Sequence, residues 1–271
     1  RVAIRVNPDV DAETHPYIST GLSSNKFGVD SKTALTIYKR RKDFTHIQFT
    51  GIDMHIGSQI TSIDPFVEAV GKLSELCFEI QKDGLKLDHF DVGGGIGVSY
   101  DGEQSFTINE FAKKTIPFFK KIDCEIIFEP GRFLTANGGI LVTEVLYNKK
   151  NGNKSFVVVD SAMNDLLRPS IYQAYHHIQP VQKFNNRNII IADVVGPICE
   201  TGDYFAHARE ITESKSGELL SVMSAGAYGM VMSSNYNARR RPAEIMVDGN
   251  KYSMIRSRET FEHLIWDEKI V

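Results

Sequence analysis

The stretch Asp91-Val92-Gly93-Gly94-Gly95-Ile96-Gly97 decides how the rest of the chain is interpreted. Residues 85–92, which overlap the start of this stretch, predict a buried strand, and the three glycines end that strand abruptly. Without Cβ atoms the backbone can approach a ligand closely and turn its N–H groups inward, which suits a phosphate. A tight turn is the alternative interpretation, because the spacing is not that of a dinucleotide-binding or P-loop motif.

Polar residues also follow three other predicted strands. These strands are expected at residues 1–7, 47–55 and 125–128, and helices are expected at about 31–41, 64–84 and 107–121. The strands end in Asn7, in His55 with Ser58, and in Glu129 with Arg132. An α/β barrel builds its site in this way, with the chemistry at the carboxyl ends of parallel strands.

The helices carry clear boundary signals. Asp64 followed by Pro65 predicts an N-cap and a first helical residue, and Gly84 predicts the end of the same helix. Thr107 with Glu110 predicts a capping box. The apolar residues of the first of these helices fall at helical spacing: Phe66, Val70, Leu73, Cys77 and Ile80.

Four strands are half of what a closed parallel barrel needs, although four could also form an open sheet. The chain opens on Arg1-Val2-Ala3-Ile4-Arg5-Val6, which reads as the middle of a strand. We therefore interpret residues 1–137 as the C-terminal half of a TIM-type (β/α)8 barrel that lacks its first half.

From residue 138 the pattern changes to short apolar strands separated by turn residues. These strands are expected at 140–146, 155–159, 189–194, 219–224 and 244–247, and a terminal helix is expected at 259–268. The pattern predicts a separate antiparallel β domain over residues 138–271, either a small barrel or a sandwich.

Composition narrows the class of protein. The 271 residues are 42% hydrophobic and 24% charged with a net charge of -3, which is typical of soluble globular proteins and favours neither nucleic acid nor a membrane as partner. Cys77, Cys124 and Cys199 are an odd, widely spaced set. This favours reduced thiols in a cytoplasmic protein over a disulfide framework or a metal site.

The second half adds three polar segments to those of the first. They are Asp165-Leu166-Leu167-Arg168-Pro169-Ser170-Ile171-Tyr172, Gly196-Pro197-Ile198-Cys199-Glu200-Thr201-Gly202-Asp203 and Ala225-Gly226-Ala227-Tyr228-Gly229. Together with His-Ile-Gly-Ser-Gln, Gly-Gly-Gly and Glu-Pro-Gly-Arg, their order resembles the fold type III pyridoxal-phosphate decarboxylases. Leu167-Arg168-Pro169 with Tyr172, and Cys199-Glu200 with Asp203, resemble the diaminopimelate decarboxylases among them.

The resemblance implies a pyridoxal 5'-phosphate site at the strand ends. His55 would stack on the pyridine ring, and Glu129 would keep the pyridine nitrogen protonated, which makes the ring an electron sink. The phosphate would be held by Ser58, by the amides of Gly93, Gly94 and Gly95, and by Pro130, Gly131 and Arg132 beside them, with Tyr228 touching both phosphate and substrate.

The resemblance also implies a substrate and a reaction. Arg132, Arg168, Tyr172, Glu200 and Tyr228 would bind meso-diaminopimelate, whose far end carries a carboxylate for an arginine and an ammonium for Glu200. The reaction would release carbon dioxide and form L-lysine. Cys199, with a reference pKa of about 8.5, would protonate the carbanion; a small buried hydrophobe is the alternative role for this cysteine.

The resemblance further implies a homodimer with shared sites, in which Cys199 and Glu200 act in the neighbouring subunit. The family attaches the cofactor to a lysine on the first barrel strand, and no such strand is present. Lys26 does not take that role, since it follows what we place as the fifth strand. The fragment alone is thus expected to be inactive. A polyamine-branch decarboxylase such as carboxynorspermidine decarboxylase, a racemase, and a non-catalytic paralogue stay open.

Overall fold

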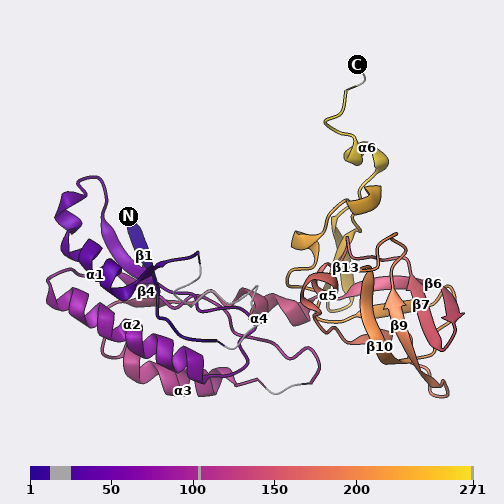
Figure 1. Cartoon of the computed structure of the whole chain (residues 1–271), viewed down its shortest axis with the longest axis horizontal. Coiled ribbons are helices and arrows are strands. Elements are labelled where there is room, and N and C mark those ends of the chain that lie inside the picture. Colours follow the sequence, from indigo (N-terminus) through magenta and orange to yellow (C-terminus); the bar gives the residue numbers. More distant parts are fainter. Residues whose placement is uncertain (13–25, 103–104, 270–271) are drawn as a thin grey trace. The chain divides into compact units, whose positions relative to one another are not determined.

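The computed structural model describes residues 1–12, 26–102 and 105–269, and the chain divides into two compact units, residues 1–135 and 136–271 (Figure 1). The division falls two residues before the boundary expected from the sequence. Among the described residues, no helix is both long enough and apolar enough to cross a membrane.

The first unit is a parallel sheet with helices between its strands. The strands run β1 Val2–Asn7, β2 Val29–Asp30, β3 Phe49–Asp53, β4 His89–Asp91 and β5 Glu125–Ile127, in the spatial order β2-β1-β3-β4-β5. Every pair is parallel, so the carboxyl ends of the strands lie at one edge. The parallel sheet and the alternation with helices agree with a partial barrel. The strands are shorter than predicted, although backbone hydrogen bonds continue past their ends, from the Met54 amide to Asp91, from the Val92 amide to Ile127 and from the Glu129 amide to Gly93.

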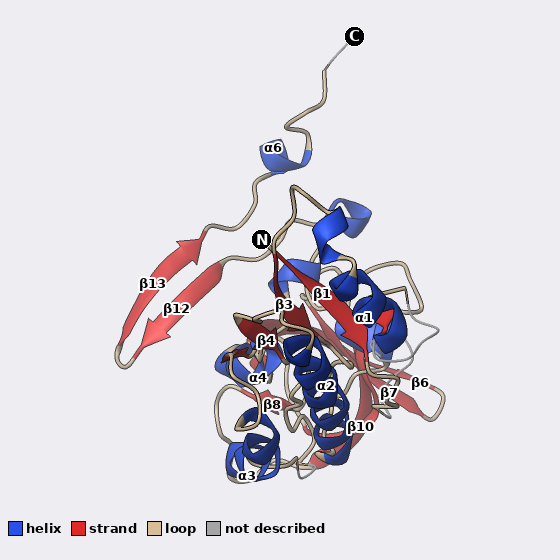
Figure 2. Cartoon of the chain, turned by 90° about the vertical axis from the view of Figure 1, so that its left-hand side faces the viewer, coloured by secondary structure: helices blue, strands red, loops and turns tan. Residues whose placement is uncertain are grey.

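Helices pack their apolar faces on this sheet. They are α1 Ser31–Lys39, α2 Asp64–Lys82, α3 Ile108–Phe119 and α4 Gly131–Thr135, with a 3₁₀ turn at Arg41–Asp43. Helices α2 and α3 lie side by side in Figure 1, and Figure 2 shows α2 alongside the strands. All five apolar residues that predicted α2 are buried against the sheet, including Phe66 and Leu73. Their burial, rather than helix propensity, fixes the helix in place.

The helix boundaries confirm two of the predicted signals and correct a third. Thr107 and Glu110 form the predicted capping box at the start of α3, and Gly84 follows α2 with a φ of 82°. Asp64 is not the N-cap of α2 but its first residue. Ile63 is the N-cap, and the Asp64 carboxylate instead accepts a hydrogen bond from Lys114 Nζ of α3 at 3.0 Å.

The second unit contains a six-stranded sheet and a separate hairpin. The strands are β6 Leu141–Asn151, β7 Lys154–Val159, β8 Ile178–Pro180, β9 Ile189–Val195, β10 Tyr204–Thr212 and β11 Leu219–Val222, in the order β10-β9-β7-β6-β11-β8. Strands β12 Glu244–Asp248 and β13 Lys251–Arg256 pair as the hairpin. Short helical segments are α5 Arg168–Tyr172, α6 Phe261–Leu264, and 3₁₀ turns at Ala136–Gly138, Met230–Met232 and Tyr236–Ala238.

Two expectations for this unit were wrong. The sheet is mixed rather than antiparallel, because β7 pairs with β9 in parallel. The long connection between these strands, which carries α5 and β8, allows this crossover. The terminal helix is only Phe261–Leu264, since its apolar side chains bury no face; Phe261 is 64% exposed and Trp266 79% exposed.

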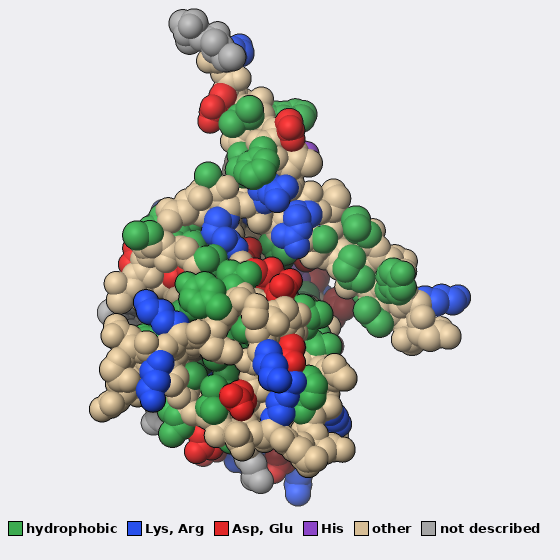
Figure 3. Space-filling model, turned by 90° about the vertical axis from the view of Figure 1, so that its right-hand side faces the viewer, with side chains coloured by type: hydrophobic (Ala, Val, Ile, Leu, Met, Phe, Trp, Pro, Cys, Tyr) green, Lys and Arg blue, Asp and Glu red, His purple; other side chains and the backbone are tan. Residues whose placement is uncertain are grey.

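The surface of the second unit is mixed in character. Figure 3 shows basic, acidic and hydrophobic side chains interspersed over the face turned to the viewer. Its own apolar core lies between the strands and includes Val145, Val159, Phe205 and Val222.

Candidate functional site

His55 and Gly94 are joined by a hydrogen bond at the strand ends of the first unit. The Gly94 amide donates to His55 Nδ1 at 3.1 Å, so this nitrogen must carry a lone pair. Burial, and secondarily the positive charge of Arg5, lower the pKa of His55. The ring is therefore neutral, with its proton on Nε2, and is held in one orientation.

The three glycines are required by close approach between backbones. A Cβ on Gly93 would lie 2.2 Å from the Met54 carbonyl oxygen, one on Gly94 would lie 2.2 Å from the Glu129 carbonyl oxygen, and one on Gly95 would lie 2.3 Å from the Gly57 carbonyl oxygen. The glycines thus lock the ends of β3, β4 and β5 together. Gly131 differs, since a Cβ there would meet no atom within 4 Å.

Arg132 and Ser58 lie in direct contact. Arg132 Nη2 donates to Ser58 Oγ at 3.0 Å, and its Nη1 donates to the Tyr100 hydroxyl at 2.8 Å. The guanidinium is buried, with the residue 6% exposed, and it sits at the start of α4. The amides of Gly93, Gly94 and Gly131 already donate, to Asp91 Oδ1 at 2.8 Å, to His55 Nδ1 and to the Glu129 carbonyl. The guanidinium of Arg132, the Ser58 hydroxyl and the Gly95 amide are the remaining donors that suit a phosphate.

Glu129 and Pro130 connect β5 to α4. The Glu129 amide donates to the Gly93 carbonyl at 2.9 Å, and its own carbonyl accepts from the Gly131 amide at 2.8 Å. The Glu129 side chain is exposed. The backbone of this turn is therefore fixed to the glycine loop, while its carboxylate is available to a ligand.

Two half-buried charged residues, Arg5 and Asp53, lie near this loop and were missed from the sequence. Arg5 of β1 donates to the His55 carbonyl at 3.2 Å, and its Nε has no acceptor among the described residues. Burial raises the pKa of Asp53 to about 6, with Asp91 and Glu129 adding to the rise and Arg5 opposing it. The sequence does carry a signal for Arg5, because it is a charged residue within an otherwise apolar strand.

Asn7, the polar residue that ends β1, lies away from these contacts. Its Nδ2 donates to the Phe27 carbonyl at 2.6 Å, and so it supports the chain after β1. Lys26 contacts the Phe27 ring, with Nζ 5.1 Å from the centroid.

In the second unit, Arg168 and Tyr172 lie at the two ends of α5. Arg168 is 5% exposed, and its Nη1 lies 2.8 Å from His176 Nε2. Tyr172 is half-buried. His176, which sequence reasoning did not select, is fully buried at 0% exposure.

Cys199 and Glu200 lie on an exposed turn that a buried carboxylate supports. Asp203 accepts hydrogen bonds from the Ile198 amide at 2.7 Å and from the Met163 amide at 2.6 Å. Burial raises the pKa of Asp203. Asp203 thus shapes the turn and leaves Cys199 and Glu200 exposed at its surface.

Two further contacts gather this part of the second unit. Ser170 of α5 donates its hydroxyl to the Gly202 carbonyl at 2.6 Å, which ties α5 to the Cys-Glu turn. Tyr236 donates its hydroxyl to Glu200 Oε2 at 3.3 Å, and no pattern in the sequence indicates this contact. Tyr228 adopts a left-handed φ of 58° and is 41% exposed.

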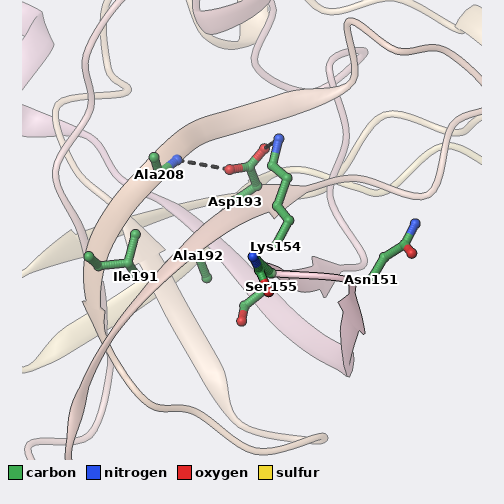
Figure 4. A pocket seen from close by; sticks show the side chains of 8 residues that line it. Asn151, Lys154, Ser155, Ile191, Ala192, Asp193 and Ala208 are labelled. Carbon is green, nitrogen blue, oxygen red and sulfur yellow. Dashed lines mark hydrogen bonds and ion pairs between the residues drawn. The ribbon is translucent and has the colours of Figure 1, made fainter.

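One of the cavities of the second unit holds none of the predicted site residues. It measures about 360 Å³ and is lined by Lys154, Ser155, Ile191 and Asp193 among others (Figure 4). Asp193 accepts from the Ala208 amide at 2.8 Å and pairs with Lys154 Nζ at 2.6 Å and His207 Nδ1 at 2.8 Å. This carboxylate therefore holds the bulge of β10.

The relatives of this chain among known proteins carry the same name. The chain is 46% identical over 266 residues to the diaminopimelate decarboxylase of Aquifex aeolicus, covering 98% of this chain and 63% of that protein. It is 46% identical over 264 residues to the diaminopimelate decarboxylase of Haemophilus influenzae, at 97% and 63% coverage. The chain therefore spans less than two thirds of the length of these relatives.

A solved structure agrees with the sequence relatives. The diaminopimelate decarboxylase of Helicobacter pylori, complexed with L-lysine, matches with a TM-score of 0.93 and 42% identity. The match covers 98% of this chain and 66% of that one.

Residues 1–136 match the family model described as the pyridoxal binding domain of pyridoxal-dependent decarboxylases. This range coincides with the first unit, whose strand ends carry the donor set that suits a phosphate. The chain belongs to the pyridoxal-dependent decarboxylase family.

Proposed function

We propose that the protein to which this chain belongs decarboxylates meso-diaminopimelate to L-lysine with pyridoxal 5'-phosphate. The observation that carries the proposal is the likeness to diaminopimelate decarboxylases over 98% of the chain, in both units. The charged residues of the second unit add support, since Arg168 suits a carboxylate and Glu200 an ammonium at the far end of this substrate.

The first unit supplies the residues that hold the cofactor. Ser58, the Gly95 amide and Arg132 would donate to the phosphate, and Gly93, Gly94 and Gly131 would line it without a side chain. His55 presents a neutral ring. When bound, pyridoxal phosphate would supply an electron sink for the electron pair that stays on the substrate carbon when carbon dioxide leaves. Glu129 would hold a proton on the pyridine nitrogen.

The second unit supplies the groups that meet the substrate. Arg168, Tyr172 and Tyr228 would bind it, with Glu200 held by Tyr236. Cys199 is exposed and would donate a proton to the carbon that loses carbon dioxide.

The proposed assembly is a homodimer in the cytoplasm. Cys199 and Glu200 would serve the cofactor site of the second subunit, so one two-fold interface would complete two sites. The exposure of the Cys-Glu turn supports this role, since a turn that serves another subunit must lie at the surface of its own.

The test is release of carbon dioxide by the full-length protein from meso-diaminopimelate, ornithine, arginine and lysine. We expect the diaminopimelate rate to exceed the others by at least about tenfold, because only this substrate offers the distal carboxylate and ammonium together. Comparable rates with ornithine would reject the substrate, and faster release from carboxynorspermidine would favour the polyamine branch.

A further inference from the structure

His176 makes two hydrogen bonds that fix its protonation. Its Nε2 lies 2.8 Å from Arg168 Nη1, and its Nδ1 lies 2.8 Å from the Met223 carbonyl oxygen. A guanidinium can only donate and a carbonyl can only accept. The ring must therefore accept at Nε2 and donate from Nδ1, which makes it a neutral imidazole in a single tautomer.

The backbone around this ring is held from several sides. The Met223 amide donates to the His177 carbonyl at 2.8 Å, and the Met223 carbonyl accepts from His176 Nδ1. Met223 therefore contacts both histidines. Arg209 Nη1 donates to the His176 carbonyl at 3.1 Å. The ring is fully buried, and these contacts fix the position of its Nε2.

Arg168 is the first residue of α5, which is a short helix. Helix α5 has five residues and ends at Gln173, whose φ of 52° is left-handed. A helix this short has few internal hydrogen bonds to fix its side chains. The His176 ring therefore supplies a rigid contact for the guanidinium that α5 alone does not.

We propose that His176 is a positioning residue that orients Arg168 toward the carboxylate of the substrate's far end. This inference rests on the proposed function. A neutral histidine suits the role better than a carboxylate would, because it directs the guanidinium without adding a negative charge. An acidic residue in its place would compete with the substrate's carboxylate for Arg168.

The proposal predicts selective loss of carboxylate recognition. L-lysine keeps the far-end carboxylate of diaminopimelate, and cadaverine has the same chain and amines without it. In the full-length, cofactor-loaded protein, His176→Ala is expected to weaken L-lysine binding about tenfold, or about 1.4 kcal/mol, and to leave cadaverine binding unchanged. Calorimetry of both ligands measures the two affinities.

Two matched variants serve as controls. His176→Gln keeps an acceptor for Arg168 and is expected to recover most of the L-lysine affinity. His177→Ala removes the exposed neighbouring histidine and is expected to bind both ligands as the wild type does. Equal weakening of L-lysine and cadaverine by His176→Ala would show a merely structural role and overturn the proposal.

A measurement on the wild type covers the case in which His176→Ala does not fold. Nitrogen-15 NMR is expected to show the proton of His176 on Nδ1 and none on Nε2 at neutral pH. The opposite tautomer would overturn the proposal. Failure of the proposed function would instead appear as a wild type that releases no carbon dioxide from diaminopimelate.

Discussion

At the scale of the residue, the contacts of Arg132 in the first unit bear most directly on the proposed binding of the cofactor phosphate. It is buried, it donates to Ser58 and Tyr100, and it lies next to the glycine loop. Arg132→Ala is expected to weaken pyridoxal phosphate binding by the value of a charge-assisted hydrogen bond, about 1.5–3 kcal/mol. Absorbance titration of the full-length apoprotein measures it.

Lys120→Ala is the matched control, because it removes an exposed positive charge from the same unit. Cofactor affinity that is equal in Arg132→Ala and wild type would show that Arg132 only supports Ser58 and Tyr100.

The raised pKa of Asp53 is expected to make the free energy of unfolding depend on pH. Its folded pKa of about 6 lies above the reference value of 3.8, chiefly because of burial. Between these values the native state keeps a proton that the unfolded state has lost, so the free energy of unfolding falls as pH rises through this window. Solvent screening limits the effect to about 1–2 kcal/mol.

Asp53→Asn cannot titrate and isolates this effect. The free energy of unfolding of the wild type minus that of the variant is expected to fall from pH 4 to pH 7, as urea titrations at each pH would show. A difference that stays constant across this range would contradict a raised pKa for Asp53.

At the scale of the element, the glycine loop joins three strands. A Cβ at Gly94 would lie 2.2 Å from the Glu129 carbonyl oxygen, and a Cβ at Gly131 would meet nothing within 4 Å. Gly94→Ala is expected to separate β4 from β5 and to lower the free energy of unfolding by about 3 kcal/mol or more, within the range of severe point mutations. Gly131→Ala is expected to change it by about 0.5 kcal/mol or less.

Urea titration of the two alanine variants side by side gives the comparison. Equal stabilities would mean that the loop can rearrange and that close backbone approach does not explain its glycines.

The elements that sequence predicts well are those with strong local signals. Helix α3 follows from its capping box, and α2 follows from apolar spacing that became a buried face. Strand β10 escaped prediction because a bulge around Ala208, with a φ of 43°, breaks its alternation. The parallel pairing of β7 with β9 depends on a crossover, which no local pattern encodes.

The candidate site divides in the same way. His55, Ser58, Gly94 and Arg132 follow strands, and the structure joins His55 to Gly94 and Ser58 to Arg132. Tyr100, His176 and Tyr236 contact Arg132, Met223 and Glu200, which are distant in the sequence, so a single sequence could not indicate these contacts.

At the scale of the whole molecule, the proposed dimer can be tested by mixing inactive full-length variants. One variant carries Cys199→Ala, and the other lacks the lysine that holds the cofactor. Random pairing is expected to form half of all dimers as hybrids with one intact site, which restores about a quarter of wild-type activity. Steady-state carbon dioxide release measures the recovery.

Subunit exchange must be demonstrated separately, for example by mass spectrometry of labelled subunits. Exchange without recovery would place Cys199 in the site of its own subunit or outside any site.

We propose that the protein selects, through Arg168, a substrate whose far end carries a carboxylate. The most direct measurement is the ratio of kcat/KM for meso-diaminopimelate to that for ornithine, in full-length wild type and in Arg168→Ala. We expect this ratio to be well above about ten in the wild type and to fall by about tenfold or more in Arg168→Ala. A fall of this size corresponds to the loss of a charge-assisted contact of about 1.5–3 kcal/mol. A ratio near one in the wild type, or one that Arg168→Ala leaves unchanged, would contradict it.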